Sequence, residues 1–233
     1  ERGHEATIYH PHGDPCKWLG YGRVRFAQPD ALTKERPDVL MCVLDPAVDF
    51  FAIAQAAKPK VRAMVMFGFE PTMERGAALR GELAAQSEDR NIRLWREAIV
   101  KGWHFVADSP WQVNWLREQT GIEAAPPFGG VNTRQFRVIP GMRQDAPPVR
   151  MLASGDPRWR KGTETVTSAW ARIEMDVERE TYWGKRYSQT QLVEAYNRAH
   201  IFCDGHLVGG WCNPVLEALA CGCFPVVGDI ESL

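Results

Sequence analysis

Apolar residues along the chain form two kinds of run that alternate. Continuous apolar runs predict strands buried on both faces, as in a parallel sheet. They cover residues 36–44, 60–69 and 149–155. Residues 4–11 predict a strand by their alternation, and further strands are predicted at residues 103–109, 200–205 and 223–229.

Between these strands the apolar residues recur at helical spacing. Val166, Ala169, Trp170 and Ile173 stand at i, i+3, i+4 and i+7 and predict a helix that Thr163 begins. Other predicted helices cover residues 47–57, 110–120, 188–199 and 214–221, and a polar, Ala-rich stretch at 73–102 is helical in character. Strands that alternate with helices predict an α/β fold.

The alternation stops once and then restarts. Residues 122–148 are rich in proline and show no clear period, which is typical of a loop and a connector. We therefore expect two α/β halves: residues 1–139, a linker at 140–148, and residues 149–233.

Composition narrows the classes of function. The formal net charge of −1 gives no overall reason to expect nucleic acid or an anionic membrane as a partner. No apolar run reaches the roughly 20 residues that a membrane span needs. The six scattered cysteines form no C-x-x-C pair, and we interpret them as reduced, mostly small core residues of a cytosolic protein.

The stretch HLVGGWCNPVLEALACG, residues 206–222, carries the strongest candidate site. Gly209 and Gly210 would let a ligand approach the backbone closely, and Asn213 and Pro214 predict a helix start whose free N–H groups suit a phosphate. Glu217, about one turn into this helix, could accept two hydrogen bonds from a vicinal diol such as a ribose. A glycine turn before a helix whose single acid faces solvent explains the spacing equally well.

A second candidate lies in the loop DPRWRKG, directly after the strand at 149–155. Arg158, Arg160 and Lys161 could neutralise a diphosphate there, because open α/β sheets bind ligands at the carboxyl ends of their strands. The alternative is a solvated basic loop.

Taken together, several segments resemble retaining, nucleotide-sugar-dependent glycosyltransferases of the GT-B fold (the group 1 family). The resemblance is carried by ERGHEATIYHP, by VADSPWQVNWLREQTGIEAAPPFGGVNTRQF, by LASGDPRWRKGTETVTSAW and, most specifically, by YSQTQLVEAYNRAHIFCDGHLVGGWCNPVLEALACGCFPVV. It implies two Rossmann-like domains whose parallel sheets face each other across a cleft, an N-terminal acceptor-side domain and a C-terminal domain that binds the donor nucleotide.

The resemblance also implies roles for residues. Lys161 matches the lysine that contacts the donor diphosphate, and Glu217 matches the second glutamate of an E-x7-E motif, which holds the ribose hydroxyls. Arg158, Arg160, Gly209, Gly210, Asn213 and Pro214 complete the expected donor site. The donor is then a nucleoside diphosphate sugar, and the acceptor is a hydroxyl of a glycan, a lipid-linked glycan or a small molecule. We expect no metal and no other cofactor, and a cytoplasmic location with peripheral contact to the inner membrane face as an option.

The chain departs from the family pattern at specific positions. Gly209 replaces the first glutamate of the motif, which faces the donor sugar, and Asp156 replaces an expected arginine, whose charge Arg158 or Arg160 would then supply. The stretch between Ala169 and Gly184 is shorter than the family usually needs for a strand and a helix, and we expect the chain to be incomplete at both ends. Two alternatives stay open: a catalytically silent GT-B module that binds a nucleotide or a partner glycosyltransferase, and a sugar-nucleotide epimerase or phosphorylase.

Overall fold

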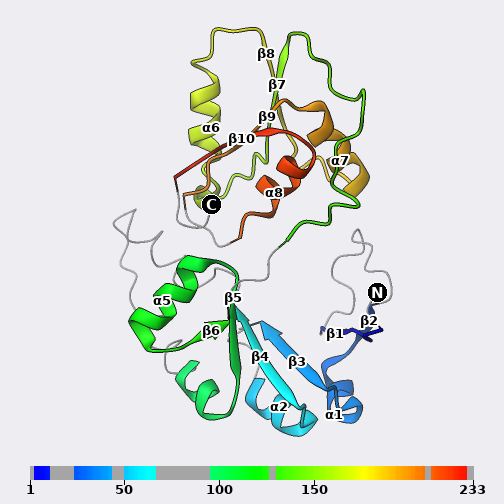
Figure 1. Ribbon diagram of the computed structural model, residues 1–233, viewed down its shortest axis with the longest axis vertical. Helices are drawn as coiled ribbons and strands as arrows, with labels where there is room; N and C mark the ends of the chain where they lie inside the picture. The colour runs from blue at the N-terminus through cyan, green and yellow to red at the C-terminus, as the bar shows by residue number, and fades with distance from the viewer. Residues whose placement is uncertain are drawn as a thin grey trace.

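The computed structural model describes residues 3–10, 24–43, 50–66, 95–125, 130–207 and 211–229 of the chain. Two four-stranded sheets organise these residues, and every strand pair in both sheets is parallel. Figure 1 shows each sheet with its own helices, one group above the other along the long axis. The predicted α/β class with parallel sheets is confirmed.

The first sheet takes its strands in sequence order, β3-β4-β5-β6. The strands are β3 (Val39–Val43), β4 (Val61–Met66), β5 (His104–Ala107) and β6 (Ala124–Ala125). The helices in this part include α2 (Phe50–Ala57) and α5 (Pro110–Thr120), and residues 95–100 are helical as well. Met64, Trp95, Phe105 and Leu116 are almost wholly buried in its core. Pro110 begins α5, and Gly121 ends it in the left-handed conformation with its N–H donated to Arg117 O, as the sequence predicts.

The second sheet has the order β10-β9-β7-β8. The chain therefore adds β8 on one side of β7 and then adds β9 and β10 on the other side. Its strands are β7 (Val149–Ala153), β8 (Val177–Thr181), β9 (Ile201–Asp204) and β10 (Phe224–Val227). Three helices cover it: α6 (Thr163–Trp170), α7 (Gln189–Arg198) and α8 (Asn213–Ala220). The Ser188 hydroxyl and the Gln191 side chain form a reciprocal capping box that begins α7.

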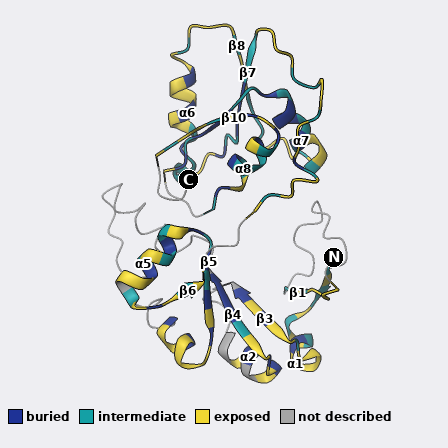
Figure 2. Ribbon diagram, in the orientation of Figure 1, coloured by how far each residue is buried: buried dark blue, intermediate teal, exposed yellow. Residues whose placement is uncertain are grey.

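Alternation along β7 divides the second core between the two faces of the sheet. Met151 and Ala153 pack with Val166 and Trp170 of α6, whereas Leu152 packs on the opposite side with Tyr196 of α7. A strand buried on both faces needs apolar residues at successive positions, which explains the continuous run in the sequence. Figure 2 shows buried residues along β4 and β5, whereas β3 and the outer faces of the helices carry exposed ones.

The segment that follows the first sheet packs against the second. Phe136 is buried in the second core, and Val131 and Ile139 pack against the same cluster. Asn197 of α7 fixes this segment: its Oδ1 accepts the Ile139 N–H at 2.6 Å and its Nδ2 donates to Arg137 O at 3.0 Å. The expected end of the first half at residue 139 stays a prediction, and this packing favours an earlier end.

Several elements were not predicted. The polar strand β8 was not predicted because VERET shows no apolar run; it lies in the stretch that is shorter than the family usually needs for a strand and a helix. The strand at residues 7–9, β1 (Thr7–Tyr9), pairs with β2 (Arg25–Ala27) in a separate small sheet rather than joining a main one. Two short helical segments follow β2, namely η1 (Pro29–Ala31) and α1 (Leu32–Glu35).

Two further expectations concern cysteines and membrane spans. The five cysteines within the described residues are free and buried, which agrees with their prediction as small core residues; Cys16 lies outside the described residues. Among the described helices, none combines the length and the apolar character that a membrane crossing requires.

Asn197 generates a prediction about stability. The residue is 2% exposed and its side chain also donates to Val193 O at 3.0 Å, so Asn197→Ala leaves the half-buried Ile139 N–H and the Arg137 carbonyl without these partners. We expect the free energy of unfolding to fall by about 3 kcal/mol, as measured by urea denaturation. The exposed Asn114 of α5 provides the matched control, and Asn114→Ala should change stability by less than about 0.5 kcal/mol. Equal effects of the two substitutions would contradict the anchoring role of Asn197.

Candidate functional site

The candidate site lies where the strand order of the second sheet reverses. The chain runs from β7 to β8 on one side and then returns to place β9 on the other side of β7. In open α/β sheets the loops that leave two such strands at their carboxyl ends diverge and leave room for a ligand. The loop after β7 contains the predicted residues Arg158, Arg160 and Lys161, and the loop after β9 leads to Glu217.

Two glycines bring these loops into backbone contact. A Cβ atom added to Gly162 would stand 1.7 Å from the carbonyl oxygen of Gly205, and one added to Gly205 would stand 2.4 Å from that of Gly162. Gly162 also adopts a positive φ of 57°, which side chains rarely allow. The Leu207 N–H donates to Arg160 O at 2.9 Å and fastens the same crossing. The contact fixes Lys161 against the loop that follows β9.

Lys161 takes part in a chain of buried hydrogen bonds. It ends the short helical turn η2 (Trp159–Lys161), and its Nζ contacts Nε2 of His206, whose Nδ1 contacts Oδ1 of Asp204. A carboxylate can only accept, so Nδ1 carries the ring proton and Nε2 is free to accept from the Lys161 ammonium. The Cys212 thiol donates to the second oxygen, Oδ2, of Asp204 at 2.7 Å. Asp204 and His206 are 7% and 6% exposed.

The groups in this hydrogen-bonded series shift one another's pKa values. Burial opposes ionisation of Asp204, but the hydrogen bonds that it accepts from His206 and from the Cys212 thiol outweigh burial and lower the pKa of the Asp204 carboxyl. Burial lowers the pKa of Lys161; the nearby Cys212 and Asp204 oppose this shift and the guanidinium of Arg158 adds to it. A half-buried ammonium in such surroundings is poorly solvated by water and therefore available to an anion.

Asp156 neutralises the neighbouring Arg158. The Asp156 carboxylate, 3% exposed as a residue, accepts from Arg158 Nε at 3.0 Å through both oxygens and also from the Arg158 backbone N–H at 3.0 Å. The guanidinium lies 5.5 Å from the centre of the Trp183 ring. Burial opposes ionisation of Asp156, but these bonds and the Arg158 charge lower its pKa. Asp156, which stands where the family pattern has an arginine, therefore binds the side chain of Arg158.

Glu217 lies on α8, one helical turn from its start. The helix begins at Asn213, with Cys212 at the capping position, so the prediction of Asn213 as the cap and Pro214 as the first residue was wrong by one residue. Cys212 lacks a β-region conformation and a side-chain cap bond, which leaves the first turn's N–H groups to other partners. Asn213 is exposed and Pro214 is half-buried at this turn.

The Glu217 carboxylate is half-buried and partly satisfied. Oε2 accepts from the hydroxyl of the wholly buried Tyr196 at 3.1 Å, and among the described residues none donates to Oε1. Burial raises the pKa of Glu217, and the Tyr196 hydrogen bond opposes that shift. An acid held in this way is neither solvated like a surface glutamate nor locked in an ion pair.

Two of the predicted donor-site positions, Gly209 and Gly210, lie outside the described residues, whereas Arg160 is half-buried on η2. The residue after the glycine pair, Trp211, donates its backbone N–H to Oδ2 of Asp108 at 3.3 Å. Asp108 directly follows β5, so this bond links the loop before α8 to the first sheet. Burial raises the pKa of Asp108.

Sequence reasoning missed Asp204, Cys212 and Tyr196 as parts of this site. A signal for the first two exists: an Asp-x-His pair stands directly after a buried strand, followed by a cysteine just before an Asn-Pro helix start. For Tyr196 no local signal exists, because its partner Glu217 lies 21 residues further along the chain.

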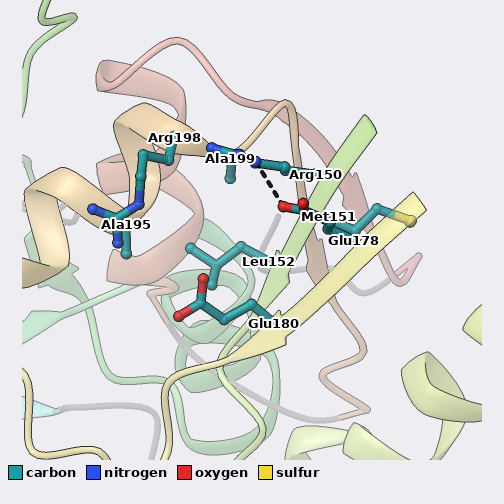
Figure 3. A pocket seen from close by; sticks show the side chains of 8 residues that line it. All are labelled: Arg150, Met151, Leu152, Glu178, Glu180, Ala195, Arg198 and Ala199. Carbon is teal, nitrogen blue, oxygen red and sulfur yellow. Dashed lines mark hydrogen bonds and ion pairs between the residues drawn. The ribbon is translucent and has the colours of Figure 1, made fainter. Parts of the chain in front are cut away.

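A separate cavity of about 280 Å³ lies elsewhere on the second sheet (Figure 3). Arg150 and Glu178, near the starts of β7 and β8, line it and form an ion pair of 2.7 Å. Arg198 and Ala199, at the end of α7, line it as well. None of the predicted site residues belongs to this cavity, which sits toward the amino ends of the strands.

Comparisons with known proteins bear on the fold. No protein-family model and no curated protein matches this sequence. Among solved structures, the chain is similar to sucrose-phosphate synthase from Thermosynechococcus elongatus, with a TM-score of 0.62 and 12% sequence identity. The match covers 83% of this chain and 56% of the synthase, so the chain spans little more than half of that protein's length. The likeness shows the fold alone.

The fold is glycosyltransferase-like. The parallel sheets and this neighbour confirm the predicted arrangement of two Rossmann-like domains of the GT-B class.

The crossing of the two loops generates a prediction. Gly205→Ala places a methyl group against the Gly162 carbonyl, and backbone atoms cannot swing away as a side chain would. We expect the free energy of unfolding to fall by about 2 kcal/mol, measured by thermal or urea denaturation. Gly130 has open space around its Cβ position, so Gly130→Ala is the matched control and should be nearly neutral. A neutral Gly205→Ala would contradict the backbone contact.

Proposed function

We propose that the chain is the core of a retaining glycosyltransferase that moves a sugar from a nucleoside diphosphate sugar to a hydroxyl acceptor. The observation that carries this proposal is the position of Lys161 and Glu217. Lys161 stands in the loop that follows β7, and Glu217 stands on α8, to which the loop after the adjacent strand β9 leads, at the point where the sheet order reverses. The GT-B fold and the sequence resemblance both support the same assignment.

Lys161 is proposed to bind the donor diphosphate. An ammonium has three N–H donors, and His206 engages one, so two remain for phosphate oxygens. Partial burial reduces competition from water, which strengthens the attraction to an anion. The first turn of α8 would add backbone N–H groups and the positive end of the helix dipole. Together these groups would supply the positive charge that a metal ion supplies elsewhere.

The same groups would assist the reaction. The bond between the anomeric carbon and the diphosphate breaks, the acceptor oxygen bonds to that carbon, and the acceptor proton passes to the departing diphosphate. Negative charge grows on the diphosphate as the bond breaks, so a fixed ammonium and helix N-terminus stabilise the transition state more than the ground state. Positioning of donor and acceptor between the two domains would supply the rest.

Glu217 is proposed to hold the ribose of the donor. A vicinal diol offers two donors, and the carboxylate has one oxygen that no described residue engages and one that it shares with Tyr196. Tyr196 is wholly buried against Phe202 and Phe136, so it fixes the rotamer of Glu217. The donor base, the sugar and the acceptor class are left open by these contacts.

A second candidate function is a catalytically silent GT-B module that binds a nucleotide without turning it over. Gly209 favours it, because the family's first motif glutamate, which faces the donor sugar, is replaced by a residue without a side chain. Hydrolysis assays across several nucleotide sugars separate the two: a transferase releases nucleoside diphosphate from at least one donor, and the silent module releases none.

Binding of nucleoside diphosphates provides the first test. Isothermal titration of UDP, GDP and ADP should show binding of at least one of them to the purified chain. Lys161→Met removes a charged hydrogen bond worth about 1.5–3 kcal/mol and should weaken this binding about 10- to 100-fold. Glu217→Gln should weaken it about tenfold. Lys185, whose side chain is 44% exposed in an ion pair with Glu180, offers Lys185→Met as a control without effect. Unchanged affinity in both site variants would overturn the assignment.

The pKa of Glu217 gives a second test. Because burial raises this pKa, the carboxylate takes up a proton at a higher pH than an exposed glutamate does. A protonated carboxyl accepts hydrogen bonds poorly, so affinity for the diphosphate should fall as pH drops toward that pKa. The 2′,3′-dideoxy diphosphate lacks the diol and corrects for titration of the phosphates. The difference between the two ligands should shrink at low pH in the unaltered chain and stay constant in Glu217→Gln. A difference that shrinks equally in both proteins would exclude Glu217 as its source.

A further inference from the structure

Three side chains beside the proposed diphosphate site form a compact cluster of potential metal ligands. Asp204, His206 and Cys212 each offer one oxygen, nitrogen or sulfur atom, and these three atoms all lie within 4.8 Å of one another. Cys212 Sγ lies 2.7 Å from Asp204 Oδ2 and 3.9 Å from His206 Nδ1. The three residues are 7%, 6% and 7% exposed, so water competes little for them.

We propose that this cluster binds a thiophilic divalent cation of the zinc class, through an Asp204 oxygen, His206 Nδ1 and Cys212 Sγ. Thiolate sulfur and imidazole nitrogen favour zinc and similar metals, whereas magnesium and calcium prefer sites made of oxygen alone. Three protein ligands leave a fourth tetrahedral position for a water molecule or a ligand oxygen. None of these three atoms is assigned to the nucleotide.

The fold holds the three ligands on fixed elements. Asp204 is the last residue of β9, Cys212 caps α8, and His206 follows the glycine contact that locks the loop. Rigid surroundings of this kind reduce the ordering that metal binding costs.

A bound cation would replace two hydrogen bonds to Asp204. Without a metal, the Cys212 thiol and the Nδ1–H of His206 each donate a hydrogen bond to the Asp204 carboxylate. A cation displaces the thiol proton to solvent and takes the Nδ1 lone pair, so the ring proton moves to Nε2. One proton is released per metal, and the charges of the cation, the carboxylate and the thiolate sum to zero.

This exchange has a consequence for Lys161. Its Nζ now contacts Nε2 of His206, which acts as an acceptor. When Nε2 becomes a donor, two donors face each other and the ammonium loses its partner. Metal binding and the His206–Lys161 contact therefore exclude each other, and removal of the Lys161 charge should strengthen metal binding.

Cobalt(II) provides the test, because cobalt–thiolate bonds give near-ultraviolet charge-transfer absorption that zinc does not. Titration of the purified, reduced chain with Co²⁺ should give this absorption together with the visible bands of a tetrahedral site, and Zn²⁺ should abolish both. Cys212→Ser keeps the hydrogen bond to Asp204, so the fold is retained, but it should remove the charge-transfer absorption and weaken binding at least about 100-fold.

Matched variants decide the assignment. Cys203 is buried and accepts from Trp170 Nε1 outside the cluster, so Cys203→Ser should leave the cobalt spectrum unchanged. Lys161→Met should bind Co²⁺ more tightly than the unaltered chain, although it is expected to lose nucleotide affinity. His206→Gln, with circular dichroism to check folding, should weaken binding as Cys212→Ser does. A chain without thiolate–cobalt absorption, or one whose absorption persists in Cys212→Ser, would overturn the proposal.

Discussion

The candidate site depends on one close approach between two backbones. The loop after β7 and the loop after β9 touch at Gly162 and Gly205, where no Cβ atom fits. Parallel strands alone would bring the loops to the same edge of the sheet, but they would leave the side chains free to point into solvent. The glycine contact instead presses Lys161 onto His206, so that a charged group from one loop is oriented by the other.

Buried charge then requires the rest of the arrangement. The Asp204 carboxylate is almost wholly buried and stays ionised because an imidazole, a thiol and, through the imidazole, the Lys161 ammonium compensate it. Burial of an isolated carboxylate or ammonium would cost several kcal/mol of folding free energy. Each charged group in this network is therefore stabilised by its hydrogen-bond and charge partners rather than by the conformational preferences of its own segment. The same three groups that satisfy Asp204 also match what a thiophilic metal requires, which links the anion site to the proposed cation site.

The sequence predicted the parts whose causes are local. A continuous apolar run identified β7, which is buried on both faces, and Pro110, Gly121 and Ser188 marked helix ends through their own backbone chemistry. It missed β8, which pairs along an edge and therefore needs no apolar run. It also missed the partners of Lys161 and Glu217, since His206 and Tyr196 stand 45 and 21 residues away from them along the chain. Contacts between residues so far apart in the sequence depend on the order of the strands in the sheet, which the spacing of apolar residues does not reveal.

The central claim is that an anion bridges the half-buried lysine and the start of α8 while Glu217 holds the attached pentose. A crystal structure of the chain with the nucleoside diphosphate that it binds best tests this most directly. The account predicts phosphate oxygens within hydrogen-bond distance of Lys161 Nζ and of the first backbone N–H groups of α8, and ribose hydroxyls on the Glu217 carboxylate. A nucleotide bound at another edge of the sheet, or a Glu217 carboxylate that touches only Tyr196 and water, would contradict it.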